Sequence, residues 1–233
     1  MRVHCEWGLT GVHALRDRVA ALIVVDVLSF CTAVDIAVSR GAVVYPFPYG
    51  DATAAEVRAK RLGAMAASPD RAGDQVSLSP ASLARLNAGD KILLPSPNGS
   101  RLSLEGGGAM TMAASLRNAS AVAEHARQLV GGADVAVIPA GERWADGSLR
   151  PAIEDLLGAG AVIAALGGVC TAEAELARRA FMAAGGDVAD LVADSLSGRE
   201  LTGRGFARDV ELAVEIDVSA TVPLLVNAGY RRA

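Results

Sequence analysis

Short runs of Val, Ile and Leu recur along the chain, and stretches with helical patterning separate them. Six such runs are present in the 233 residues: 21–27, 42–47, 91–94, 109–113, 134–138 and 222–226. Alternation of this kind is typical of strands that pair in parallel and are covered by the connecting helices. We therefore predict an α/β protein, layered α/β/α around a largely parallel or mixed sheet. Residues 1–233 are expected to form one compact unit, or two fused α/β halves with a weak boundary near 88–95.

The composition agrees with this architecture. Hydrophobic residues make up 52% of the chain but aromatic residues only 4%, so the interior consists mostly of Ala, Val, Leu and Ile. A chain of this length can bury about 70% of the surface of its unfolded form, so it needs no disulfide or metal to hold a core. Small aliphatic side chains suit helices that pack on strands.

Charge and cysteine content limit the partners and the compartment. The net charge is -4, and Arg and Lys are scattered along the chain, which argues against nucleic acid as a partner. The three cysteines, Cys5, Cys31 and Cys170, are odd in number and far apart, so we expect no disulfide framework and a cytoplasmic protein. The apolar run 19–28 is too short to span a bilayer, so we expect neither a signal peptide nor a membrane partner. A homodimer is compatible with these observations, and the sequence does not decide the number of subunits.

Spacing excludes several common active sites. The chain has no Gly-x-x-x-x-Gly-Lys-Ser/Thr phosphate loop, no Gly-x-Ser-x-Gly nucleophile elbow, and no Gly-x-Gly-x-x-Gly after the first expected strand. A cysteine phosphatase loop needs Arg six residues after Cys31, where Ala37 stands. An aspartyl-phosphate enzyme needs a second Asp two residues after Asp26, where Leu28 stands. No two histidines have the spacing of a helical metal pair: His4, His13 and His125.

Asp26 follows the most apolar of the expected strands. In an open parallel sheet, ligands bind at the carboxyl ends of the strands. Ser29 and Thr32 then offer hydroxyls and free backbone amides near this carboxylate, where an anion can bind. The alternative is that Asp26 only caps the helix expected to begin near residue 32. The sequence leaves function and capping equally open.

A second polar segment, residues 95–101, follows another expected strand directly. Asn98 and Gly99 can adopt positive φ and expose successive N–H groups, while Ser100 adds a hydroxyl and Arg101 a bidentate donor for phosphate or sulfonate. Asn-Gly is also the strongest short signal for a β-hairpin. Because Pro95 and Pro97 stand before this pair and three glycines follow soon afterwards, we favour an anion-binding loop.

Two arginines and a pair of acids stand at other element boundaries. Arg117 and Arg143 each follow the end of an expected strand, so both are candidates for anion binding. Glu154 and Asp155 are the only charges in the first turn of an otherwise apolar helix over 151–166, whose body we expect to be buried and whose start exposed. These acids lie roughly 100° apart around the helix. They either complement the helix dipole or supply oxygen ligands to Mg²⁺, which usually takes only one or two carboxylates.

Taken in order, five segments of the chain resemble the 2-phosphosulfolactate phosphatase family. They are 24–28 (VVDVL), 96–101 (SPNGSR), 116–123 (LRNASAVA), 138–141 (IPAG) and 154–160 (EDLLGAG). Each segment alone is weakly specific, but together they span most of the chain.

The resemblance implies an α/β enzyme that uses Mg²⁺ to hydrolyse 2-phospho-3-sulfolactate to 3-sulfolactate and phosphate, a step toward coenzyme M in organisms that make it. It implies metal binding or water activation by three residues: Asp26, Glu154 and Asp155. It implies binding of the small phosphate or sulfonate substrate by six others: Asn98, Gly99, Ser100, Arg101, Asn118 and Arg143. Helix capping alone would account for Asn118.

The chain departs from the family pattern in two places. The family usually carries Arg where Ser29 stands, in a segment like Asp-Val-Leu-Arg-Ala-Thr. Its Gly-rich Glu-Arg segment falls here at 61–67, and only Ser79-Pro80 is recognisable from the Gly-Asn-Ser-Pro that follows it. We therefore carry two hypotheses. The first is a Mg²⁺-dependent phosphatase acting on this or a similar small anionic ester, and the second is a catalytically inactive protein of the same fold that binds an anionic metabolite.

Overall fold

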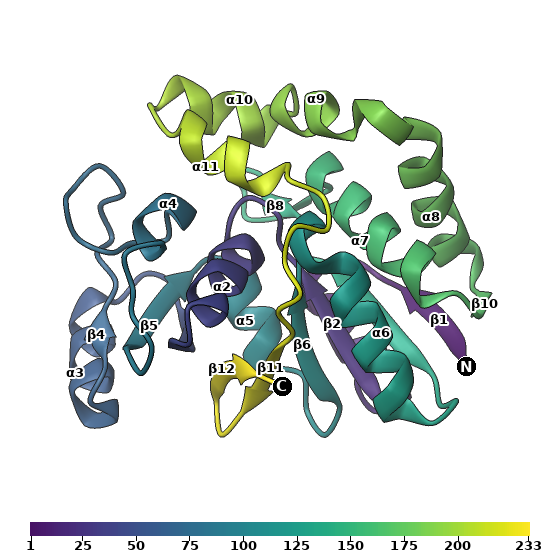
Figure 1. Cartoon of the computed structure of the whole chain (residues 1–233), viewed down its shortest axis with the longest axis horizontal. Helices are drawn as coiled ribbons and strands as arrows, with labels where there is room; N and C mark the ends of the chain where they lie inside the picture. The colour runs from purple at the N-terminus through teal and green to yellow at the C-terminus, as the bar shows by residue number, and fades with distance from the viewer.

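The structure is a computed structural model that describes residues 1–233. Ten strands form one mixed sheet, and two short strands form a separate hairpin (Figure 1). The sheet strands are β1 (Arg2–Cys5), β2 (Ala21–Val25), β3 (Val43–Pro48), β4 (Met65–Ala66), β5 (Lys91–Ser96), β6 (Met110–Ala114), β7 (Val135–Pro139), β10 (Val169–Cys170), β11 (Pro223–Val226) and β12 (Gly229–Arg232). The separate hairpin consists of β8 (Glu142–Arg143) and β9 (Leu149–Arg150).

The sheet consists of two parallel blocks with an antiparallel hairpin between them. One block has the order β10-β1-β7-β2-β6 and the other β3-β5-β4, and every pair inside each block is parallel. Between them lie β11 and β12, with β11 antiparallel to β6 and β12 antiparallel to β3. A segment near the C-terminus therefore joins the two blocks into one sheet.

Helices cover both faces of this sheet. They are α1 (Gly8–Leu15), α2 (Phe30–Ser39), α3 (Ala52–Leu62), α4 (Pro80–Leu83), α5 (Gly99–Leu104), α6 (Ala119–Val130), α7 (Ile153–Leu166), α8 (Ala172–Ala184), α9 (Val188–Ala193), α10 (Leu196–Gly203) and α11 (Ala207–Ala213). None of them combines the length and apolar character needed to cross a bilayer. Figure 1 shows α9, α10 and α11 at the top of the view, where they run across the ends of the strands rather than over a face of the sheet.

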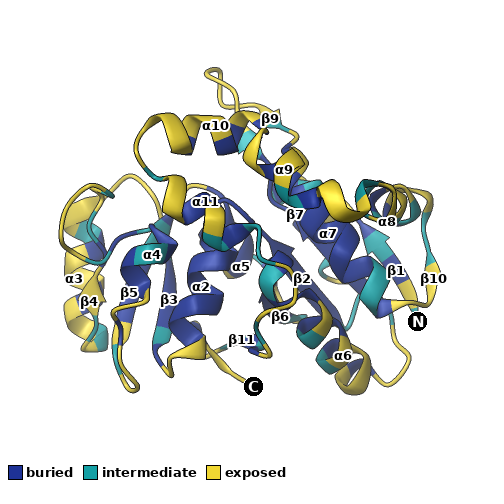
Figure 2. Ribbon diagram, turned by 45° about the horizontal axis from the view of Figure 1, so that its top comes forward, coloured by how far each residue is buried: buried dark blue, intermediate teal, exposed yellow.

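Strand β2 shows how the side chains divide between two cores. Ile23 and Val25 pack in a core with α6, α7 and α8, whereas Leu22 and Val24 pack in a core with α1, α2 and α5. This division follows from the alternation of side chains along a strand. Figure 2 shows α2, α5 and α7 mostly buried, and α3 and α8 on the outside. The expected α/β class with a largely parallel or mixed sheet is confirmed, while the domain division stays a prediction.

Candidate active site

Asp26 lies directly after β2 and joins the starts of two helices. Its Oδ1 accepts a hydrogen bond from the N–H of Phe30 at 3.1 Å, and its Oδ2 accepts one from the N–H of Gly99 at 2.9 Å. Asp26 therefore binds the starts of α2 and α5 and also lies at the carboxyl end of β2. The two interpretations of this residue do not exclude each other. Burial raises the pKa of Asp26 to about 6, against the two amides and the charge of Arg71.

Gly99 permits the close approach to Asp26. A Cβ atom at Gly99 would lie 2.4 Å from Cδ1 of Phe30 and 2.7 Å from Oδ2 of Asp26. The expectation of positive φ at Asn98 and Gly99 is wrong, because the chain passes from β5 straight into α5, with φ of -115° at Asn98 and no positive φ at Gly99. The hairpin alternative is excluded for the same reason. Close packing, and not a left-handed backbone, accounts for the glycine.

Helix α7 contributes two acids with different surroundings. Asp155 accepts hydrogen bonds from the N–H of Val27 at 2.7 Å and of Gly141 at 2.8 Å, so it ties together the ends of β2 and β7. The expectation of an exposed start for α7 is wrong, since Glu154 and Asp155 are only 2% and 3% exposed and Asp155 turns toward these strand ends. Burial, with the charges of Asp26 and Glu154, raises the pKa of Asp155 well above its ordinary value.

A fourth carboxylate, Glu142, comes from the β8–β9 hairpin. Its Oε2 accepts a hydrogen bond from Nδ2 of Asn98 at 2.9 Å. Burial and the charge of Asp26 raise the pKa of Glu142 to about 7, whereas Asn98 and Arg150 act in the opposite direction. We call Asp26, Glu142, Glu154 and Asp155 the carboxylate cluster. The charge of Glu154 contributes to the raised pKa values of Asp26, Glu142 and Asp155, and a bound cation would relieve this repulsion.

The carboxylate cluster fits Mg²⁺ held partly by the protein. No three His, Cys, Asp or Glu side chains stand so that they alone could hold a metal ion. Mg²⁺ usually keeps several waters and binds one or two protein carboxylates together with substrate phosphates. Glu154 makes no hydrogen bond within the chain, and because no fully buried side-chain oxygen lacks a partner, its carboxylate retains access to solvent. The carboxylate of Glu154 therefore has no hydrogen bond for a cation to displace, and its charge contributes to the raised pKa of Asp26.

Arg71 brings positive charge to the cluster from the loop between β4 and α4. Its Nη1 donates hydrogen bonds to Oγ of Ser29 at 3.1 Å and to Oδ2 of Asp209 at 3.4 Å. Its guanidinium lies 5.9 Å from the ring centroid of Phe206. Burial lowers the pKa of Arg71, against the charges of Asp209 and Asp26. A guanidinium therefore lies beside Ser29, the position where the resemblance leads us to expect an arginine.

Asp209, in α11, anchors the loop that carries Arg71. Besides binding Arg71, its Oδ1 accepts hydrogen bonds from Oγ of Ser79 at 2.6 Å and from the N–H of Ala81 at 3.1 Å. Asp209 is 1% exposed. Two of its three donors, Ser79 and Ala81, lie at the start of α4, and the third is Arg71. A single carboxylate therefore fixes both the start of α4 and the guanidinium of Arg71.

A pocket of about 400 Å³ adjoins these groups. Four arginines line it together with Glu142 and Glu200: Arg71, Arg143, Arg150 and Arg204. The other members of the carboxylate cluster are buried and do not line the pocket, but the charges of Asp26 and Glu154 raise the pKa of Glu142, which does. A molecule in this pocket meets an excess of positive charge with carboxylates at one side. Such a lining suits a small molecule with several negative charges.

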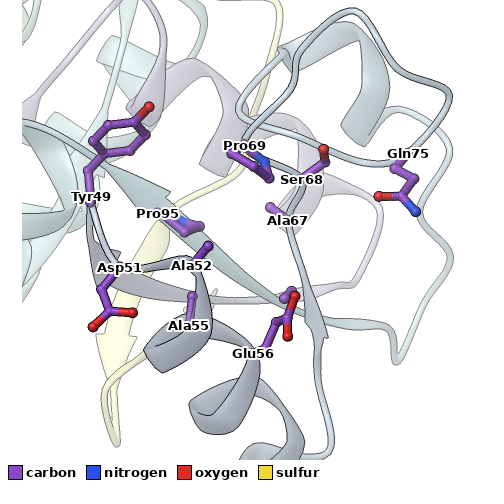
Figure 3. A pocket seen from close by; sticks show the side chains of 12 residues that line it. Tyr49, Asp51, Ala52, Ala55, Glu56, Ala67, Ser68, Pro69, Gln75 and Pro95 are labelled. Carbon is purple, nitrogen blue, oxygen red and sulfur yellow. The ribbon is translucent and has the colours of Figure 1, made fainter.

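A neighbouring pocket of about 280 Å³ shares Tyr49, Pro69 and Pro95 with the first (Figure 3). Its charged lining consists of Asp51 and Glu56, with no Arg, Lys or His. Two carboxylates without a cation repel an anion, so this second pocket is a poor site for a phosphate ester. The arginine-lined pocket is the candidate active site.

The structure brings most of the sequence-predicted residues near this site. Asn98 and Gly99 contact the carboxylate cluster, and Ser29 contacts Arg71. Arg101 and Arg143 together line two smaller pockets, and Arg143 also lines the candidate active site.

Two predicted hydroxyls are engaged inside the fold. Oγ1 of Thr32 donates to the carbonyl of Val27 at 2.8 Å, and Oγ of Ser100 donates to the carbonyl of Leu94 at 3.0 Å. Both residues are 0% exposed. They hold the strand ends in shape and do not line the pocket.

Arg117 and Asn118 lie elsewhere, where they hold the segment after α11. Nε of Arg117 donates to Oδ2 of Asp35 at 2.9 Å, and its Nη1 pairs with Glu215. Nδ2 of Asn118 donates to the carbonyl of Thr221 at 3.1 Å. The structure does not bring these two residues to the candidate active site.

Four residues of the site are not predicted from the sequence: Arg71, Glu142, Arg150 and Asp209. Glu142 could have been found from the sequence, since it stands three residues after the end of β7 and directly before Arg143. Arg71 could also have been found from the sequence. It lies in the segment 70–73 (DRAG), which stands before Ser79-Pro80. This segment matches the family's Gly-rich Glu-Arg segment better than residues 61–67 do. Arg150 and Asp209 have no such signal in the sequence.

Comparison with known proteins points to one family. A family model described as 2-phosphosulpholactate phosphatase matches residues 10–228. The chain is 36% identical over 136 residues to a 2-phosphosulfolactate phosphatase of Methanothermobacter thermautotrophicus, a match that spans 58% of this chain and 56% of that protein. It is 29% identical over 213 residues to a probable 2-phosphosulfolactate phosphatase of Carboxydothermus hydrogenoformans, spanning 87% of this chain and 85% of that protein. The chain belongs to the 2-phosphosulpholactate phosphatase family.

Proposed function

We propose that this chain is a phosphatase that uses Mg²⁺ to hydrolyse 2-phosphosulfolactate, or a small ester of similar charge, to the alcohol and phosphate. The observation that carries the proposal is a pocket of about 400 Å³ that is lined by four arginines and by Glu142, the member of the carboxylate cluster that reaches it. The names of the two relatives support this substrate.

Hydrolysis needs charge stabilisation more than covalent help from the protein. A water oxygen forms a bond to phosphorus while the bond between phosphorus and the ester oxygen breaks, and the phosphoryl oxygens stay negatively charged throughout. Arg71 supplies a cation for these oxygens, since it reaches Ser29 beside Asp26. Glu142, with a pKa of about 7, suits the transfer of a proton from the attacking water. The departing alcohol oxygen takes up a proton in turn.

Mg²⁺, when bound, would add positive charge against the phosphoryl oxygens. Glu154 and Asp26 are the residues that we expect to hold it. Asp155 has a supporting part, because its two hydrogen bonds to Val27 and Gly141 keep the ends of β2 and β7 together beneath the site.

The alternative of a protein without turnover rests on the absence of an arginine at position 29. Arg71 now weakens that argument, because its guanidinium reaches Ser29 from another loop. No other observation favours the alternative, so we retain the phosphatase.

Phosphate release from 2-phosphosulfolactate tests the proposal. We expect turnover with Mg²⁺ and its loss in excess EDTA. Glu154→Gln keeps the shape of the side chain but removes its charge, so half-maximal activity should need more Mg²⁺. Glu173→Gln, on the exposed first turn of α8, is the matched control and should leave the Mg²⁺ titration unchanged.

Two results would count against the proposal. Full turnover in EDTA would remove the metal from the reaction. Failure to release phosphate from 2-phosphosulfolactate and from a panel of other small phosphate esters, with Mg²⁺ present and the fold intact by circular dichroism, would support the binding protein instead.

A further inference from the structure

Arg150 holds a positive charge in the candidate active site, next to the carboxylate cluster. It lies directly opposite Glu142 in the β8–β9 hairpin, and residues opposite each other in an antiparallel pair present their side chains on the same face. Three groups fix the guanidinium. Nη2 donates to Oγ of Ser197 at 3.2 Å, the ring centroid of Trp144 lies 5.7 Å away, and a carboxylate oxygen of Glu200 lies 4.0 Å away.

No close ion pair engages the guanidinium of Arg150, although its charge acts on Glu142. The side chain of Arg150 is only 11% exposed, whereas Glu200 is 58% exposed and at the limit of an ion pair. Exposed partners at such distances contribute little. Glu142 makes its hydrogen bond with Asn98 rather than with Arg150. A guanidinium has five N–H donors, and only one hydrogen bond within the chain engages this one. The remaining donors are available to a molecule in the pocket that Arg150 lines.

Arg71 and Arg150 occupy different parts of the pocket. Arg71 bonds to Ser29, three residues from Asp26, and to Asp209 of α11. Arg150 instead joins the hairpin to α10 through Ser197. If the phosphoryl group lies at the Asp26 side, as the proposed function requires, Arg150 can bind a second anionic group of the same molecule. The other two arginines that line the pocket, Arg143 and Arg204, are exposed, whereas Arg150 is half-buried.

We propose that Arg150, positioned by Ser197 and Trp144, binds the sulfonate of the substrate and so selects sulfonated esters. This inference rests on the proposed function for the placement of the phosphoryl group. A sulfonate is a weakly basic anion that keeps its charge at any physiological pH and competes poorly for Mg²⁺, so it needs a cationic side chain. The carboxylate of the substrate is a better metal ligand and can lie on the Mg²⁺ side. The planar guanidinium fork matches the oxygens of such oxyanions.

Two esters that differ only in the sulfonate test this subsite: 2-phosphosulfolactate and 2-phospholactate. In Arg150→Met we expect KM for 2-phosphosulfolactate to rise about tenfold or more, as the loss of a charge-assisted hydrogen bond implies. KM for 2-phospholactate should stay unchanged. Ser197→Ala should raise KM for the sulfonated ester by a smaller factor. Arg208→Met, an exposed arginine paired with Glu211 outside the pocket, should change neither constant.

A binding measurement separates this proposal from the proposed function. By calorimetric titration, the wild-type protein should bind 3-sulfolactate more tightly than lactate, and Arg150→Met should abolish that preference. Suppose that no ester is hydrolysed, but that the wild-type protein prefers 3-sulfolactate and Arg150→Met does not. The sulfonate subsite is then supported, and the proposed phosphatase function is rejected. If Arg150→Met raises KM for both esters equally, or leaves the preference for 3-sulfolactate intact, the subsite is overturned. Should Arg150→Met fail to fold, Ser197→Ala decides: a rise in KM for 2-phosphosulfolactate alone supports the subsite, and an equal rise for both esters, or no rise, overturns it.

Discussion

Arg71 donates a hydrogen bond from Nη1 to Oγ of Ser29 at 3.1 Å, across 42 positions of the chain. A hydroxyl and a guanidinium from separate loops thus share the place beside Asp26. The side chain of Arg71 is 14% exposed, and its ion-pair partner Asp209 is 1% exposed. A charge held so firmly at a pocket wall can meet a phosphoryl group without rearrangement.

Arg71→Met should lower kcat/KM for 2-phosphosulfolactate by roughly 10- to 100-fold, the range expected when one hydrogen bond to a charged group is lost. The physical reason is the loss of positive charge beside Asp26. Steady-state kinetics measure the change. Arg58→Met, on the exposed side of α3, is the control. Activity equal to that of the wild type in Arg71→Met would show that Arg71 only holds the loop.

Gly99→Ala should destabilise the fold by about 1–3 kcal/mol, the usual effect of an added carbon in a packed site. The new Cβ would press on Phe30 and on Oδ2 of Asp26, at 2.4 and 2.7 Å. Urea unfolding gives the free energy, and phosphate release should fall because Asp26 is displaced. Gly108→Ala is the matched control, since a Cβ there meets nothing within 4 Å. Equal stability of the two variants would contradict the packing argument.

The metal-free protein should lose stability as the pH rises from about 5 to about 8. Asp26 and Glu142 have pKa values of about 6 and about 7 when folded, above the values of roughly 4 for unfolded carboxyls. The folded state therefore holds protons more tightly, so its advantage is fully present below the unfolded pKa and disappears as the pH passes the folded pKa.

Thermal unfolding in EDTA measures this decline, and Mg²⁺ should reduce it by compensating the ionised carboxylates. Glu142→Gln should flatten the dependence, because one of the two titrating groups is gone. A melting temperature that rises across this interval in EDTA would contradict the expected repulsion in the carboxylate cluster.

Arg117→Met should destabilise the protein by about 3–5 kcal/mol, because it leaves the buried carboxylate of Asp35 without its cation. KM for the phosphate ester should stay unchanged, since Arg117 does not line the pocket. Urea unfolding and steady-state kinetics on the same preparation give both values, with the exposed Arg127→Met in α6 as the control. A raised KM at wild-type stability would return Arg117 to the substrate.

The apolar runs predict the sheet well because burial on both faces demands unbroken Val, Ile and Leu. All six expected runs form strands. The pattern does not predict β1 and β12. In β1, Arg2 and His4 alternate with buried residues, and β12 ends in the exposed residues Arg231 and Arg232. A strand that is only half buried resembles a loop in its composition, and its neighbours in the sheet decide its state.

The residues of the candidate active site likewise fall into those that the sequence predicts and those that it does not. Asp26, Glu154 and Asp155 could be chosen from the sequence, because acids at strand ends and helix starts have a local signature. Asp209 could not, because it meets Arg71 across 138 positions. That contact depends on how α11 packs against the loop after β4, and nothing near either residue records it. Thr32 and Asn118 show the converse, since polar residues at strand ends also serve to satisfy nearby backbone groups.

The place of the β11–β12 hairpin has a consequence for the order of events during synthesis on a ribosome. By the time residue 114 has emerged, β3, β5 and β6 are all outside the exit tunnel, yet the two parallel blocks have no shared edge until residues 223–232 follow. The edges of β6 and β3 must therefore wait unpaired while about half of the chain is still being made, and exposed strand edges invite pairing with other chains. Closure of the sheet therefore requires β11 and β12, and a nascent chain stalled before residue 223 would leave both strand edges open to aggregation.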